Sequence, residues 1–195
     1  MSKRKSKKAA PREKRADSAA GLRKALTSRS KAELVSTLLE LAEADRGVLR
    51  QLTARFDVAA PPKELVAATR QAIADATAFD ERDMNTNFDY DYEAYEAVKR
   101  NFGQLIASGQ LRVAMQLALE LMKQGSHQVE MSDEGMMTDD VENCLSVILQ
   151  GLKKSDLPAD EVIAWCSAML SADRVGCIVR EPLQALRSQF QTAAR

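Results

Sequence analysis

Aromatic and acidic side chains alternate in one short stretch of the chain, between residues 79 and 95. All three tyrosines fall there, together with a phenylalanine and several carboxylates. Aromatic rings supply contact area, and carboxylates select a basic partner. One interpretation is a partner-binding edge made by Phe88, Asp89, Tyr90, Asp91 and Tyr92. The other is that the rings cap the hydrophobic core, because burial of aromatic side chains is strongly stabilising.

The same stretch raises the question of calcium binding. Asp89, Asp91 and Glu93 are spaced like the first ligands of an EF-hand loop. The sixth position, where that loop needs glycine, is Ala94. The twelfth, where it needs a bidentate glutamate, is Arg100, which would repel the cation. The spacing therefore excludes an EF-hand, and we expect no metal site.

The sequence contains few of the residue combinations that catalysis requires. A nucleophilic Ser or Cys usually needs a neighbouring histidine as base, and the only histidine is His127. It lies in a polar GSHQ segment, which predicts a solvated loop side chain. Neither G-x-G-x-x-G nor G-x-x-x-x-G-K is present, so no phosphate loop is expected. The sequence predicts a protein that is not an enzyme and that uses no cofactor.

A basic N-terminal tail is attached to an acidic body. Residues 16–195 hold 20 basic and 27 acidic side chains, a net charge of −7. The tail, with almost no large hydrophobic residue, predicts disorder over 1–20. It is either a solvated arm or a nucleic-acid contact, because clustered cations neutralise phosphates. Its eight basic residues, opposed only by Glu13, are Lys3, Arg4, Lys5, Lys7, Lys8, Arg12, Lys14 and Arg15.

The number and spacing of the three cysteines indicate the cellular compartment. Cys144, Cys166 and Cys177 are separated by 22 and 11 residues, without a C-x-x-C pair. This is neither a disulfide framework nor zinc-ligand spacing, and the apolar sequence around each predicts a buried side chain. No apolar run approaches the roughly 20 residues that span a bilayer, and the N-terminus has no signal-peptide core. We expect a cytoplasmic protein with no membrane association.

Helical periodicity organises the rest of the chain. The sequence predicts an all-α domain over 28–190 of about eight helices in antiparallel hairpins, as an irregular bundle or a short solenoid-like array. A subdivision is possible near 79–92, which is predicted to be a loop. Ser30 and Glu33 predict a capping box, and Gly125 predicts the end of a helix that begins near residue 110. Leu38 and Leu149 are both expected on buried faces.

A family resemblance accompanies this layout. The segment SKAELVSTLLELAEADRGVLRQL, residues 30–52, resembles the bacterial helical region that lies C-terminal to SWIM-type zinc fingers and also occurs in uncharacterised stand-alone proteins. The hairpin from Tyr95 to Leu121, Asp139 and Asp140, and the turn from Asp173 to Gly176 fit the same pattern. The resemblance implies a helical accessory region. The finger itself needs a C-x-C pair and C-x-H; neither occurs here, so its zinc and nucleic-acid roles are not implied.

Two functions follow as hypotheses. The first is a non-enzymatic interaction or scaffold module that docks a protein partner on the acidic aromatic stretch. The alternative is a nucleic-acid-associated accessory protein that uses the basic tail. Neither the partner's identity nor the oligomeric state follows from the sequence.

Overall fold

The computed structural model describes residues 21–56, 64–87 and 90–193. All regular structure in these ranges is helical, as predicted. Residues 21–27 are helical and precede nine further helices. These are α2 (Lys31–Ala44), α3 (Arg46–Arg55), α4 (Leu65–Thr77), α5 (Glu81–Asn87), α6 (Tyr92–Ala107), α7 (Leu111–Met131), α8 (Thr138–Lys153), α9 (Ala159–Ala172) and α10 (Arg180–Ala193).

The chain divides into two compact units, Met1–Leu49 and Arg50–Arg195. We call their described parts the N-terminal unit and the C-terminal unit. The division falls inside α3 and does not coincide with the possible subdivision near 79–92. Among the described residues, none of the helices combines the length and apolar character needed to cross a membrane.

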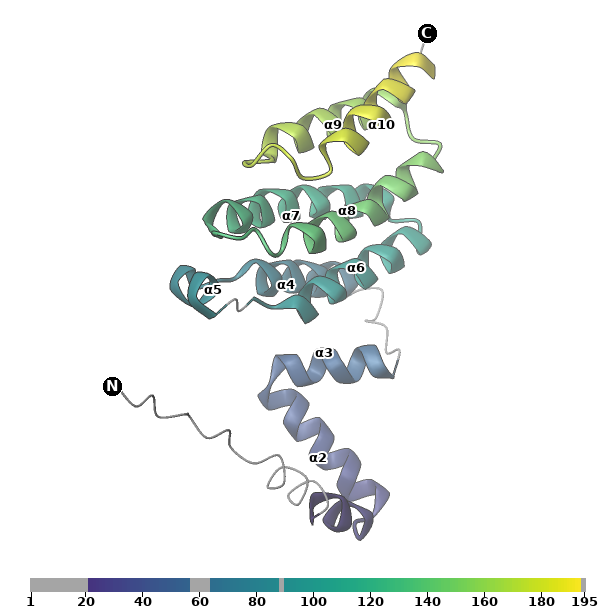
Figure 1. Ribbon diagram of the computed structural model, residues 1–195. Helices are drawn as coiled ribbons and strands as arrows, with labels where there is room; N and C mark the ends of the chain where they lie inside the picture. Colours follow the sequence, from purple (N-terminus) through teal and green to yellow (C-terminus); the bar gives the residue numbers. More distant parts are fainter. Residues whose placement is uncertain (1–20, 57–63, 88–89, 194–195) are drawn as a thin grey trace, which may run out of the picture. The chain divides into compact units, whose positions relative to one another are not determined.

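In the C-terminal unit the helices lie in layers of two (Figure 1). α4 lies beside α6, α7 beside α8, and α9 beside α10, and the layers follow one another in chain order. Each helix turns an apolar stripe inward. On α6 the stripe includes Val98, Phe102 and Leu105, and on α8 it includes Leu145 and Ile148, all fully buried. The predicted core of these helices, Leu149 included, is confirmed.

Two helices differ from the prediction. The stretch expected to be a loop contains α5, because the Asp80 carboxylate accepts the Arg82 and Asp83 N–H groups at 2.9 and 3.1 Å and so caps a helix. α7 continues past Gly125 to Met131. Gly125 is needed inside the helix, since a Cβ there would lie only 2.9 Å from Val141 Cγ2 of α8. With α5 and residues 21–27, the described chain holds more helices than the approximately eight predicted.

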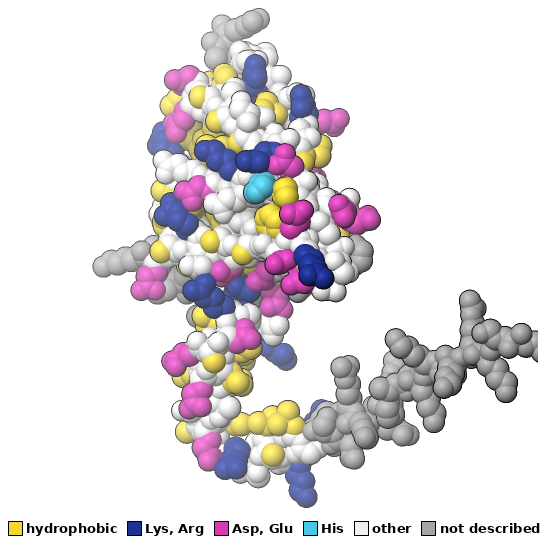
Figure 2. Space-filling model, turned by 90° about the vertical axis from the view of Figure 1, so that its left-hand side faces the viewer, with side chains coloured by type: hydrophobic (Ala, Val, Ile, Leu, Met, Phe, Trp, Pro, Cys, Tyr) yellow, Lys and Arg dark blue, Asp and Glu magenta, His cyan; other side chains and the backbone are white. Residues whose placement is uncertain are grey.

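The N-terminal unit is built on the predicted capping box. The Ser30 hydroxyl accepts the Glu33 N–H at 3.2 Å, and the Glu33 carboxylate accepts the Ser30 N–H at 2.8 Å. Among the described residues, most of the aliphatic face that follows is exposed, and Figure 2 shows hydrophobic side chains on the surface of this unit. The expectation of a buried Leu38 is therefore wrong: it is 40% exposed. The large hydrophobic side chains exposed in the described part of this unit are Leu22, Leu26, Val35, Leu38, Leu39, Leu41 and Leu49.

Candidate functional site

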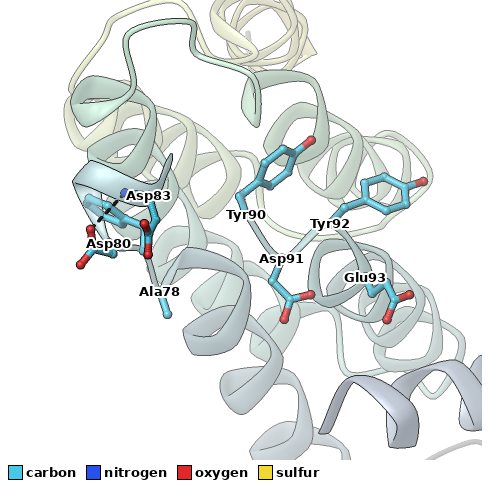
Figure 3. Close-up of a pocket in the computed structure, with 8 residues that line it drawn as sticks. Ala78, Asp80, Asp83, Tyr90, Asp91, Tyr92 and Glu93 are labelled. Carbon is cyan, nitrogen blue, oxygen red and sulfur yellow. Dashed lines mark hydrogen bonds between the residues drawn. The ribbon is translucent and has the colours of Figure 1, made fainter. Parts of the chain in front are cut away.

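A hollow of about 490 Å³ opens where α4, α5 and α6 meet. It contains four carboxylates, and no Lys or Arg is among its described lining residues. Figure 3 shows Asp80 and Asp83 on one side and Asp91 and Glu93 on the other. α5 brings the first pair into place, and the start of α6 brings the second. The lining residues are Ala78, Phe79, Asp80, Asp83, Tyr90, Asp91, Tyr92 and Glu93.

Tyr90 anchors the hollow to the core. Its hydroxyl donates a 2.8 Å hydrogen bond to Asp140 Oδ2 on α8. Its half-buried ring meets Tyr95 edge to face, with 6.3 Å between the ring centroids. Burial, with the neighbouring Asp140 carboxylate as a second cause, raises the pKa of Tyr90 to about 12. The hydrogen bond and the ring contact fix the position of the ring. The raised pKa keeps the Tyr90 hydroxyl protonated in neutral solution.

Tyr92 is placed differently. Its side chain is 52% exposed and lies at the first turn of α6. That turn is fixed by Asp91, whose carboxylate accepts the Ala94 N–H at 2.9 Å and also contacts the Arg50 guanidinium. Of the two neighbouring tyrosines, Tyr90 thus faces the core and Tyr92 faces solvent.

Tyr92 and Glu93 also line a second hollow, of about 500 Å³. Glu93 accepts a 2.5 Å hydrogen bond from Gln51 Nε2 there. In contrast to the first hollow, this one mixes both signs of charge. Its other lining residues are Arg50, Gln51, Arg55, Glu96 and Arg100. A ligand lying across Tyr92 would therefore meet acidic side chains on one side and arginines on the other.

The predicted site residues fall into two groups. Tyr90, Asp91 and Tyr92 are brought together at the first hollow. Phe88 and Asp89 lie outside the described residues, as do Lys3, Arg4, Lys5, Lys7, Lys8, Arg12, Lys14 and Arg15 of the basic tail.

Sequence reasoning missed Asp80 and Asp83 as site residues, because the stretch around them was expected to be a loop. A signal was available in the sequence. An aspartate at Asp80, followed by acidic residues in the next turn, is a helix N-terminal pattern. Recognising it would have predicted α5, and with α5 the acidic wall of the hollow.

His127 lies in helix α7, so its placement in a loop was wrong. Its ring packs against Phe79, with 5.8 Å between the ring centroids. Its Nδ1 lies 3.4 Å from Glu130 Oε2, and Arg174 Nη1 donates to the same carboxylate oxygen at 2.8 Å. The Arg174 hydrogen bond, with that of His127 second, lowers the pKa of Glu130. This surface cluster is an ion-paired contact between α7 and the turn after α9.

Two of the three thiols are poorly suited to nucleophilic chemistry. Cys144 and Cys166 are buried, as predicted, whereas Cys177 is exposed, contrary to the prediction. Burial raises the pKa of Cys144 to about 12 and that of Cys166 to about 11, so neither supplies a thiolate at neutral pH. Within the described ranges, no group of three or more His, Cys, Asp or Glu side chains is arranged to hold a metal ion.

No protein-family model matches this chain, and no curated protein or solved structure matches it either. The resemblance of residues 30–52 to the SWIM-associated helical region therefore stays a prediction.

Proposed function

We propose that the chain is a non-enzymatic protein-interaction module that binds a basic segment of a partner protein at the acidic aromatic hollow. The observation that supports this proposal is the lining of that hollow, which combines four carboxylates with the half-exposed ring of Tyr92 and has no Lys or Arg among its described residues. The stacked helix pairs of the C-terminal unit serve as a short solenoid-like scaffold that holds this lining in place.

Charge and ring chemistry select a cationic partner. A Lys or Arg side chain of the partner can pair with Asp83 or Glu93, and a cation that lies over the exposed face of Tyr92 gains a cation–π contact. Arginine fits better than lysine, because its planar guanidinium both stacks on rings and bonds carboxylates with two N–H groups. An acidic segment would be repelled by the same lining. The proposal therefore fixes the sign of the partner's charge and favours arginine within it.

Rigid placement supports the same function. Tyr90 is hydrogen-bonded to Asp140, and Asp91 caps α6 through the Ala94 N–H. Because both are held by the fold, a ligand does not need to order them on binding, which reduces the entropic cost of association. In this proposal Tyr90 and Asp91 shape the hollow, and Tyr92, Asp83 and Glu93 contact the partner.

Binding of short peptides tests the proposal. We expect arginine-rich peptides to bind the full chain in fluorescence anisotropy, and acidic peptides of equal length not to bind. Tyr92→Ala should weaken binding at least about tenfold, as loss of an aromatic anchor does. Asp83→Asn with Glu93→Gln should also weaken peptide binding, and the loss should be larger at low salt than at high salt.

A matched variant controls for net charge. Asp160→Asn with Glu181→Gln removes two charges from exposed positions in the first turns of α9 and α10 and should leave binding unchanged. Equal weakening by this control would show that only bulk charge attracts the peptide, and equal binding of acidic peptides would contradict the proposal outright.

The second candidate is nucleic-acid binding through the tail, favoured by the eight basic residues among positions 1–15. Deleting residues 1–15 should then abolish binding to generic DNA and RNA, and binding by the full chain should fall steeply as salt rises. Undiminished binding by the shortened chain would show that the tail does not bind nucleic acid.

A further inference from the structure

Within the described part of the N-terminal unit, most of the apolar face of helix α2 is exposed. At about 100° per residue, the large aliphatic residues of α2 and Ala42 fall within an arc of about 160°. On that arc Val35 is 47%, Leu39 58% and Leu41 50% exposed. The acids Glu33, Glu40 and Glu43 lie on the other side of the helix. A helix patterned in this way normally buries its apolar stripe.

The segment that precedes α2 extends this surface. Leu22 and Leu26, one helical turn apart, are 60% and 42% exposed. Between the segment and α2 lies a hollow of about 420 Å³, with Ala25, Leu26 and Leu34 among its lining residues. Large contiguous apolar surfaces are uncommon on monomeric proteins and mark interaction sites.

Charge indicates what covers this surface. Residues 21–29 carry Arg23, Lys24 and Arg29 and no acid, whereas 31–45 carry four acids and one lysine. A two-fold interface pairs each surface patch with its counterpart in both directions, so the basic segment of one copy would face the acidic α2 of the other, twice. The acidic polar face of α2 also argues against a membrane surface, since anionic lipids attract Lys- and Arg-rich helices.

We propose that the N-terminal unit is a dimerisation module whose partner is the same unit of a second copy of this chain. The two pairs of helices, residues 21–27 and α2 from each copy, form a four-helix bundle that buries the exposed aliphatic face. A stable interface engages about 20–30 residues a side, so the dimer would use most of residues 21–49. The inference is independent of peptide binding by the C-terminal unit.

Sedimentation velocity of the full chain over a wide concentration range tests dimerisation. We expect a reversible monomer–dimer equilibrium. Leu38→Glu with Leu39→Glu should shift it to monomer without loss of helical circular dichroism from the C-terminal unit. Ala44→Glu with Ser36→Glu adds the same charge on the opposite side of α2 and should leave most of the dimer intact. A wild-type chain that stays monomeric throughout, or a dimer insensitive to the leucine changes, would overturn the proposal.

Charge reversal tests the two-fold pairing itself. Arg23→Glu with Lys24→Glu makes the first segment acidic, and Glu40→Lys with Glu43→Lys makes α2 basic. Each variant alone should dissociate, because like charges then face each other across the two-fold axis. An equimolar mixture should form a heterodimer, since both contacts again join opposite charges. Misfolded variants could not restore each other in this way, and a mixture that stays monomeric while the wild-type chain dimerises would refute this arrangement.

Discussion

Helices α2 and α8 have similar apolar patterns and different surroundings. Both place aliphatic residues at helical spacing over their length. On α8, Leu145, Ile148 and Leu152 are fully buried against neighbouring helices of the C-terminal unit, whereas on α2 Leu39 is 58% and Leu41 50% exposed. The difference shows that periodicity predicts that a helix forms and which side is apolar. It does not predict whether this chain or another molecule covers that side.

The two regions also differ in the sequence separation of the contacts that stabilise them. α2 begins with a local capping box that involves residues three apart. The C-terminal unit is joined by contacts between distant residues, such as Tyr90 with Asp140 and the Trp165 indole N–H with the Met115 carbonyl at 2.9 Å. We therefore expect substitutions in the C-terminal unit to affect stability more than comparable substitutions in the N-terminal unit.

The largest contrast should come from one substitution made in both helices. Leu149→Ala should lower the unfolding free energy by about 2–5 kcal/mol, through lost burial and a cavity. Leu39→Ala should cost no more than about 1 kcal/mol in the monomer, as changes at exposed positions do. Urea unfolding of dilute protein, followed by Trp165 fluorescence and circular dichroism, measures both. Equal losses would mean that α2 is covered within one chain.

The same contrast separates the features that the sequence predicts from those that it does not. The capping box at Ser30 and the apolar stripe of α8 depend on residues close together in the sequence, so the sequence predicts them. The length of α7 depends on the approach of Val141 to Gly125. The acidic hollow depends on the position of α5, where Asn85 donates to the Met131 carbonyl and accepts the Asp133 N–H. These contacts join distant residues, and no local pattern states them.

Two glycines sharpen the claim of dense packing in the C-terminal unit. Gly125→Ala should destabilise by about 1–3 kcal/mol, because the added methyl meets the branched side chain of Val141. Gly103→Ala on α6 is the matched control, since nothing lies within 4 Å of its added Cβ. It should stabilise by about 0.5–1 kcal/mol through helix propensity. Thermal melts that give both changes the same sign would contradict the described approach of α7 and α8.

The two tyrosines give a smaller contrast, within the site. Tyr90→Phe should cost about 1 kcal/mol by removing the hydrogen bond to Asp140, while Tyr92→Phe should have almost no effect on stability. The raised pKa of Tyr90 sets the pH dependence. Its contribution is present below pH 10.0 and is lost as pH rises to about 12. Urea midpoints at alkaline pH should therefore fall more for the wild-type chain than for Tyr90→Phe, and parallel curves would count against this assignment.

The smallest effect concerns the stability of the N-terminal unit at acidic pH. The Ser30 backbone hydrogen bond, with the Ser30 hydroxyl second, lowers the pKa of Glu33 from its ordinary value of 4.5. A lowered pKa stabilises the fold above 4.5, and this contribution is lost as pH falls through the folded-state value. Helicity of dilute protein should decrease in this range for the wild-type chain and less for Glu33→Gln. An identical acid titration of the two proteins would show that the box does not stabilise α2.

Hydrogen exchange at two protein concentrations tests the contrast between the units most directly. Peptides from α2 and α8 report each region separately in the same sample. We expect protection of the α2 amides to rise with concentration, as dimerisation covers its exposed face, and protection of the α8 amides to stay constant. Protection of α2 that is already at its full value in dilute protein, and equal to that of α8, would contradict the account.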